Sequence, residues 1–178
     1  MKACSARHDI EVVSVCEQSF GRREIVQMKL EKIAYGKLNA RQKENFNFQK
    51  VSAVLADYGF VTIRLSDDWK GADFIALHIS GDVRRVQLKS RLTLDRKYRG
   101  NGLDVAFSDA GTWYLYPHDE TLDRILAATK VGSTRSWQEQ GIYHFPRLSK
   151  EICEILEPYR IVGDANPLPE VAAAELMP

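Results

Sequence analysis

Residues 71–91 constrain the fold of this chain more than any other part of the sequence. An apolar run begins with a carboxylate, Asp73, and turns around residues 80–82 (Ser-Gly-Asp). It returns as a second run that carries Gln87 and Lys89. Two such runs joined by a short glycine-containing turn are typical of a β-hairpin. Because a hairpin places the start of its first strand beside the end of its second, we expect Asp73, Gln87 and Lys89 to meet at one edge of a sheet.

These three side chains suit a divalent cation and a phosphate. Magnesium prefers oxygen ligands, and one or two carboxylates together with substrate phosphate oxygens hold it. Asp73 offers a carboxylate, and Gln87 offers a neutral amide oxygen. Alternate residues of a strand share a face, so Lys89 lies on the same face as Gln87. Its ammonium can stabilise charge on a phosphate or orient an attacking water.

An Asp, a further run and then Gln-x-Lys on the next strand resemble the PD-(D/E)XK nuclease superfamily. Residues 71–76 (Gly-Ala-Asp-Phe-Ile-Ala) are similar to the Gly-x-Asp segment of its archaeal Holliday-junction resolvases, and residues 89–91 (Lys-Ser-Arg) are similar to their Glu-Val-Lys-Ser ending. Ala72 stands where many members have Pro. Gln87 replaces the usual Glu, which removes one negative charge from the metal site. The resemblance implies a restriction-endonuclease-like α/β core with a central mixed sheet flanked by helices, Mg²⁺ as cofactor with Mn²⁺ as a substitute, and DNA as partner.

Residues 39–58 predict the clearest helix of the chain. Asn39 suits the N-cap and Gly59 suits the position after the last turn. In the superfamily a Glu on this first helix often completes the metal site, and Glu44 is the candidate because it lies one turn before Phe48 on the same face. A solvated surface Glu is the alternative. The apolar positions recur at helical spacing: Phe48, Val51, Val54, Leu55 and Tyr58.

A local basic segment follows the hairpin. Residues 84–99 carry seven Lys or Arg residues and a single acid, Asp95. Cations that neutralise phosphates supply non-specific affinity for nucleic acids, and aromatic rings stack on exposed bases. A solvated charged face is the alternative interpretation. Because the segment leaves the strand that bears Lys89, we expect a DNA-gripping loop formed by Arg91, Arg96, Lys97, Tyr98 and Arg99.

Length, charge and cysteine content limit the class of protein. The 178 residues have a formal net charge of +1, which predicts no strong overall attraction to polyanions. The length suits one domain, residues 28–162, between an N-terminal extension (1–27) and a C-terminal tail (163–178). Three scattered cysteines without Cys-x-x-Cys spacing argue against a zinc site and favour a cytoplasmic protein. The sequence has no apolar run that could span a bilayer and no signal-peptide pattern.

The remaining segments predict strands and helices that flank this core. Residues 61–65 predict a strand, followed by a polar loop at 66–70. Residues 112–116 predict a buried strand that stops at Pro117. The helix predicted for residues 118–130 has Asp119 at its N-cap and His118 at the surface. A polar linker at 133–140 and a final helix capped by Ser149 complete the chain.

Two functions of different classes follow. The first is a metal-dependent DNA endonuclease that hydrolyses phosphodiester bonds, of the restriction, homing or junction-resolving type. We expect it to act as a homodimer, because cutting both strands of a duplex commonly needs two copies of the site. Its catalytic residues are Asp73, Gln87, Lys89 and Glu44, and Asp73, Glu44 and Gln87 hold the metal. The second is a catalytically inactive nuclease-like module that binds nucleic acid, and an interaction domain with a chance motif is a weaker third.

Overall fold

The computed structural model describes residues 30–163. The chain divides into two units, residues 1–33 and residues 34–178. Of the first unit only residues 30–33 are described, and they are exposed. The predicted N-terminal extension and nearly all of the predicted tail lie outside the described residues, so the proposed domain boundaries stay predictions. The helices and strands reported below belong to the second unit.

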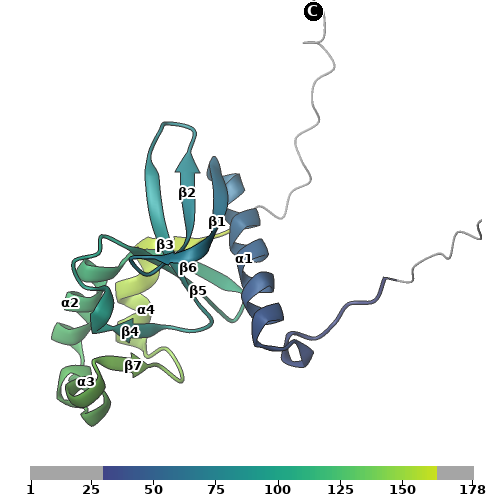
Figure 1. The fold of residues 1–178 in the computed structure, drawn as a ribbon. Helices are drawn as coiled ribbons and strands as arrows, with labels where there is room; N and C mark the ends of the chain where they lie inside the picture. The colour runs from purple at the N-terminus through teal and green to yellow at the C-terminus, as the bar shows by residue number, and fades with distance from the viewer. Residues whose placement is uncertain (1–29, 164–178) are drawn as a thin grey trace, which may run out of the picture. The chain divides into compact units, whose positions relative to one another are not determined.

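A six-stranded mixed sheet forms the centre of the fold (Figure 1). Neighbouring strands run antiparallel except for β3 and β5, which are parallel. The mixed α/β class expected from the sequence is confirmed. In spatial order the strands are β1 (Phe60–Trp69), β2 (Ala72–His78), β3 (Val83–Lys89), β5 (Asp104–Asp109), β6 (Thr112–Pro117) and β8 (Arg160–Ile161).

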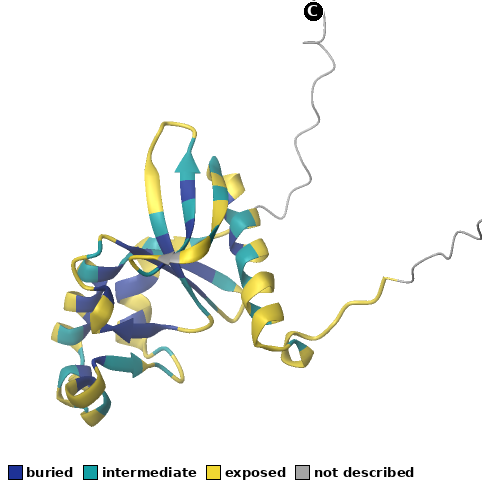
Figure 2. Ribbon diagram, in the orientation of Figure 1, coloured by how far each residue is buried: buried dark blue, intermediate teal, exposed yellow. Residues whose placement is uncertain are grey.

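Helix α1 (Ala40–Asp57) covers one face of this sheet, where Val51 and Leu55 pack against Phe74 and Val86. The other face of β5 and β6 is covered by α2 (His118–Ala128) and α4 (Lys150–Leu156). A two-stranded ribbon of β4 (Thr93–Asp95) and β7 (Ile142–His144) packs on the same side. The two larger clusters of buried residues therefore lie on opposite faces of the sheet, and a smaller third cluster contains Ala72, Tyr98 and Leu103. Buried residues are dark blue in Figure 2. Shorter helices are η1 (Tyr35–Lys37), η2 (Arg96–Tyr98), η3 (Lys130–Ser133), α3 (Arg135–Gln140) and η4 (Glu157–Tyr159).

The predicted first helix is confirmed together with its caps. Asn39 Oδ1 accepts a hydrogen bond from the backbone N–H of Gln42, and Gln42 Oε1 accepts one from the N–H of Asn39, both at 2.9 Å. This reciprocal pair satisfies donors that a helix start leaves open. Gly59 follows the last turn with φ of +77°, a conformation that glycine adopts without steric cost. Tyr58 does not join the apolar stripe, because its ring is 43% exposed and its hydroxyl accepts the N–H of Val162.

The predicted hairpin is confirmed as β2 and β3. Phe74 pairs with Val86, and Leu77 pairs with Val83 beside the turn. Val86 and Leu88 face α1, so Gln87, which lies between them, faces the opposite side of the sheet. The hairpin thus brings Asp73, near the start of β2, to the end of β3.

The polar loop expected at residues 66–70 is wrong in part. Strand β1 continues to Trp69, with an irregularity between Arg64 and Trp69, and Trp69 pairs with Ala72. Lys70 and Gly71 form the tight turn, with φ of +54° and +89°. β1 is an edge strand, and its residues Ser66 and Asp67 are exposed, so the sequence pattern there resembles that of a loop.

Two further predictions near the second half of the chain are also corrected. Helix α2 begins at His118 with Pro117 at its N-cap, and Asp119 instead accepts the backbone N–H of Gly100 at 2.9 Å. His118, expected at the surface, is 1% exposed. The expected linker at 133–140 holds α3, which Thr134 caps by accepting the N–H of Trp137. No helix within residues 30–163 is long and apolar enough to cross a bilayer.

Candidate active site

Asp73 is the centre of the candidate site. Its Oδ2 accepts the backbone N–H of Leu88 at 2.7 Å and a further hydrogen bond from Gln87 Nε2. Burial raises the pKa of Asp73, and the Leu88 hydrogen bond and the nearby Lys89 charge oppose that rise without cancelling it. The hairpin therefore holds one oxygen of the Asp73 carboxylate in a fixed position. Burial favours neutralisation of the negative charge on this carboxylate.

Gln87 is buried beside Asp73, with 7% of its surface exposed. Its amide nitrogen donates to the carboxylate, so in this arrangement Gln87 orients Asp73 through a hydrogen bond. A Glu at the same position would bring a second negative charge into contact with Asp73. Gln at this position thus avoids the repulsion that two adjacent carboxylates would have without a cation. The predicted role of the Gln87 oxygen as a metal ligand stays a prediction.

Lys89 extends from the end of β3 on the side of the sheet occupied by Tyr98. Its Nζ donates to the Tyr98 hydroxyl at 3.0 Å and lies 4.9 Å from the centroid of the ring. The Tyr98 ring packs against Gly71, where an added Cβ would lie 2.7 Å from it. The Lys89 charge is close enough to Asp73 to lower the pKa of that carboxyl. The hairpin therefore places Gln87 in contact with Asp73, as the sequence predicts, whereas the Lys89 ammonium contacts Tyr98 and acts on Asp73 through its charge.

Glu44 reaches the margin of this site from α1. Its charge adds to the factors that raise the pKa of Asp73. Its carboxylate forms an ion pair with Arg64 of β1, which also donates to Asn45 and lies 5.6 Å from the centre of the Phe48 ring. Arg64 is a site residue that the sequence interpretation missed. No local pattern marks it, since its partners come from a helix some twenty residues earlier.

A hollow of about 300 Å³ lies between α1 and the end of β3. It joins Glu44 to Lys89, so the helix and the hairpin contribute to one concave surface. We call it the catalytic hollow. Its lining residues are Tyr35, Ala40, Lys43, Glu44, Asn47, Leu88, Lys89 and Ser90.

The predicted magnesium site at Asp73 and Glu44 stays a prediction, although carboxylate oxygens are the kind of ligand that magnesium binds. Within residues 30–163 no group of three or more His, Cys, Asp or Glu residues is arranged to hold a metal. Magnesium needs only one or two carboxylates besides water and phosphate oxygens, and Asp73 and Glu44 can supply them.

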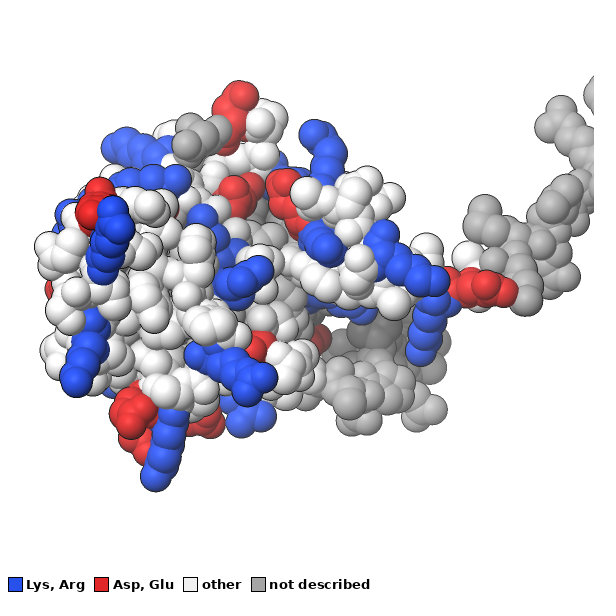
Figure 3. Space-filling view, turned by 90° about the horizontal axis from the view of Figure 1, so that it is seen from below, with Lys and Arg blue, Asp and Glu red and all other residues white. Residues whose placement is uncertain are grey.

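The basic segment does not form one exposed gripping loop. Lys97 pairs with Asp95 at 3.5 Å, and Arg99 forms an ion pair with Asp123. The guanidinium of Arg96 lies 5.0 Å from the centroid of the Trp137 ring and donates to the Trp137 carbonyl at 2.9 Å. On the face seen in Figure 3, Lys and Arg side chains are likewise spread over the surface instead of forming one patch.

Within this segment, Tyr98 and Arg91 have opposite environments. Tyr98 is 6% exposed, so its ring cannot stack on a base, and that expectation is wrong. Its far side meets buried His118, whose ring centroid is 5.8 Å away and whose Nδ1 lies 2.7 Å from Asp119 Oδ1. Arg91 is exposed, and its guanidinium makes no hydrogen bond or ion pair with the described residues. Arg91 therefore retains its predicted availability for a phosphate.

No protein-family model matches this sequence, and no curated protein matches it. Among solved structures, this chain is similar to a bacterial homing endonuclease, I-Ssp6803I, with a TM-score of 0.40 and 16% sequence identity. The similarity covers 68% of this chain and 86% of that one. At this level the similarity carries no functional inference, which depends on the site residues instead.

Proposed function

We propose that this chain is a metal-dependent nuclease that hydrolyses phosphodiester bonds in DNA, a Gln variant of the PD-(D/E)XK superfamily of restriction, homing or junction-resolving type. The supporting observation is the arrangement around Asp73. Glu44 and Lys89 line one hollow, and the fixed carboxylate of Asp73 lies close enough for both of their charges to affect its pKa. This combination binds a phosphate and a divalent cation together.

Each residue has a distinct part in the proposed reaction. Asp73 and Glu44 would hold a magnesium ion, which would supply charge neutralisation and a more acidic water. Gln87 and the Leu88 N–H keep the Asp73 carboxylate in position. The Lys89 ammonium stabilises the negative charge that grows on the phosphate oxygens in the transition state.

A second candidate function is a nucleic-acid-binding module without activity. The pairing of Glu44 with Arg64 supports it, because a carboxylate that neutralises a guanidinium is less available to a cation. The neutral Gln87 supports it as well, since the site then holds fewer negative charges than a Glu would give.

Nicking of supercoiled plasmid DNA separates these functions. We expect the wild-type chain to nick plasmid with MgCl₂ or MnCl₂, and Asp73→Asn to show no nicking. Asn keeps the size of Asp and an oxygen that can accept the Leu88 N–H, so the variant should fold. Because the pKa of Asp73 is raised, its ionisation costs folding free energy as pH rises through that pKa. Asp73→Asn should therefore melt no lower than wild type at pH 8 without metal. Binding without cleavage across divalent metals would favour the inactive module.

We also propose a homodimer, since cleavage of both strands needs two sites. The face of β1–β3 opposite α1 exposes Val61 (64%), Ile63 (49%) and Val83 (59%) on paired strands. Grouped exposed apolar side chains are typical of association surfaces. We expect Ile63→Lys to reduce the mass measured by light scattering after size exclusion to that of one chain. A wild-type chain that elutes as a monomer at DNA-binding concentrations would contradict the dimer.

A further inference from the structure

An aromatic cavity opens next to the catalytic hollow. Its volume is about 470 Å³, within the usual range of small-molecule sites. Three aromatic side chains form much of its wall, and polar groups lie between them. The lining residues that matter here are Tyr35, Phe46, Asn47, Lys50, Ser90 and Trp113. We call it the aromatic cavity.

Two of its aromatic rings are exposed, and a lysine ammonium lies over each of them. The ring centroids of Tyr35 and Phe46 are 5.4 Å apart, and the residues are 38% and 36% exposed. The Lys43 ammonium lies 5.6 Å from the Tyr35 ring centroid, and the Lys50 ammonium lies 5.5 Å from that of Phe46. Exposed aromatic rings bordered by lysines match a nucleotide, because the rings can stack on a base and the lysines can neutralise phosphates.

Contacts within the fold hold two of the aromatic side chains, Trp113 and Tyr35, in place. Trp113 is 7% exposed and packs in the core beneath α1. The Tyr35 hydroxyl accepts a hydrogen bond from Asn47 Nδ2 at 3.0 Å, which fixes the orientation of the Tyr35 ring against the helix. A site with fixed aromatic walls costs a ligand little reorganisation on binding.

The aromatic cavity is continuous with the catalytic hollow. Tyr35, Asn47 and Ser90 line both spaces, whereas Glu44 and Lys89 line the hollow alone. A phosphate at Lys89 therefore has the aromatic cavity beside it. A base that is stacked and paired inside a duplex cannot enter such a cavity, whereas an unpaired or extruded base can.

We propose that the aromatic cavity binds the base of an unpaired nucleotide next to the phosphate held at Lys89. The preferred substrate is then DNA with a single-stranded or distorted segment. This inference rests on the proposed function for the position of the phosphate. It adds a base-binding site on Tyr35 and Phe46 that selects the form of the DNA.

Binding measured in EDTA tests this inference without cleavage. Fluorescence anisotropy compares three labelled duplexes: one with an unpaired internal nucleotide, one with an abasic residue at that position, and one that is continuous. We expect wild type to bind the first most tightly and to lose roughly 5- to 150-fold in affinity for the abasic form, the range expected for one stacked base.

Variants on α1 locate the effect. Phe46→Leu removes the ring at similar bulk and should abolish the preference for the unpaired base, whereas Phe46→Trp should keep it. Tyr58→Leu is the matched control, because Tyr58 is also an exposed aromatic residue and lies at the C-cap of α1, about 18 Å further along the helix axis. It should leave all three affinities unchanged.

Equal affinity of wild type for the unpaired base and the abasic form would overturn the inference, and this comparison needs no variant to fold. A preference that survives in folded Phe46→Leu would overturn it as well. Failure of the nuclease proposal looks different: the preference persists in EDTA, yet no DNA form is cut with magnesium. Efficient cutting of the continuous duplex, with equal affinity for all three DNA forms, would support the proposed nuclease function and rule out the base-binding site.

Discussion

Lys89→Met is expected to lower the rate of DNA cleavage by roughly 100- to 1000-fold, the usual cost of losing one group that stabilises transition-state charge. Met keeps the length of the side chain and removes its charge. The ammonium of Lys89 acts on Asp73 and is held by the Tyr98 hydroxyl at 3.0 Å. Because the substrate binds through many phosphates, affinity should change far less than rate.

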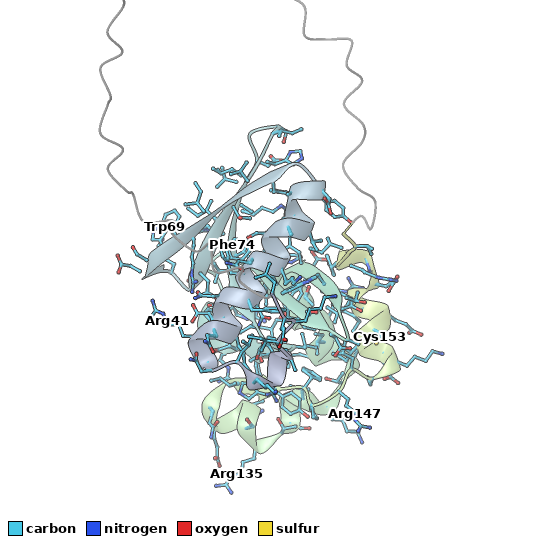
Figure 4. All side chains as sticks on the ribbon, turned by 90° about the vertical axis from the view of Figure 1, so that its right-hand side faces the viewer. Arg41, Trp69, Phe74, Arg135, Arg147 and Cys153 are labelled. Carbon is cyan, nitrogen blue, oxygen red and sulfur yellow. The ribbon has the colours of Figure 1, made fainter. Side chains whose placement is uncertain are left out.

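Single-turnover cleavage and anisotropy in EDTA separate these two quantities. Arg135→Met is the matched control: Arg135 is an exposed cation in α3 that pairs with Glu139, and Figure 4 labels it at the lower end of the ribbon. Tyr98→Phe removes the hydroxyl that accepts the hydrogen bond from Lys89 and keeps the ring, so a smaller loss of rate with unchanged DNA affinity is expected. If the Lys89→Met variant cuts DNA as fast as wild type, the Lys89 amine takes no part in the cleavage reaction.

Gln87→Glu is expected to strengthen the response to magnesium and to weaken the metal-free fold. The change replaces a hydrogen bond to Asp73 with a second buried carboxylate. The cost should be at least about 1–3 kcal/mol, typical of a buried polar group that loses its partner. For a domain of this size, about 2–4 °C of melting temperature corresponds to each kcal/mol.

The pH dependence of this loss has a defined sign. Two adjacent carboxylates raise each other's pKa, and the pKa of Asp73 is already raised by burial. The folded variant then binds protons more tightly than its unfolded chain, so its stability falls as pH rises through the raised pKa values. Its deficit in melting temperature relative to wild type should be present at pH 8 and shrink as the pH is lowered through those values.

Melting curves with and without MgCl₂ test both parts of this prediction. The cation should raise the melting temperature of Gln87→Glu more than that of wild type, because it stabilises only the folded state that binds it. Gln49→Glu, an exposed exchange of the same kind on α1, should match wild type in both buffers. A Gln87→Glu variant that melts like wild type and ignores magnesium would show that these two side chains do not form a cation site.

The sequence by itself determined the elements whose signals are local. The β2–β3 hairpin follows from two apolar runs and a glycine turn, and α1 follows from its helical spacing with Asn39 at its start. The meeting of Asp73 with Gln87 was therefore predictable, because hairpin pairing fixes which residues face each other. The same periodicity placed Lys89 on the face of Gln87.

Only the tertiary structure decided which distant segments contact these residues and how far each residue is buried. Tyr98 follows a basic strand and looks like an exposed aromatic, yet packing against Gly71 and His118 buries its ring and leaves its hydroxyl to hold Lys89. Glu44 pairs with Arg64 across the gap between a helix and an edge strand. Burial and ion pairing depend on which surfaces meet in three dimensions. The spacing of residues along the chain does not indicate which surfaces meet. The sequence could therefore indicate the chemistry of the site, while the fold decided which side chains stay available to a substrate.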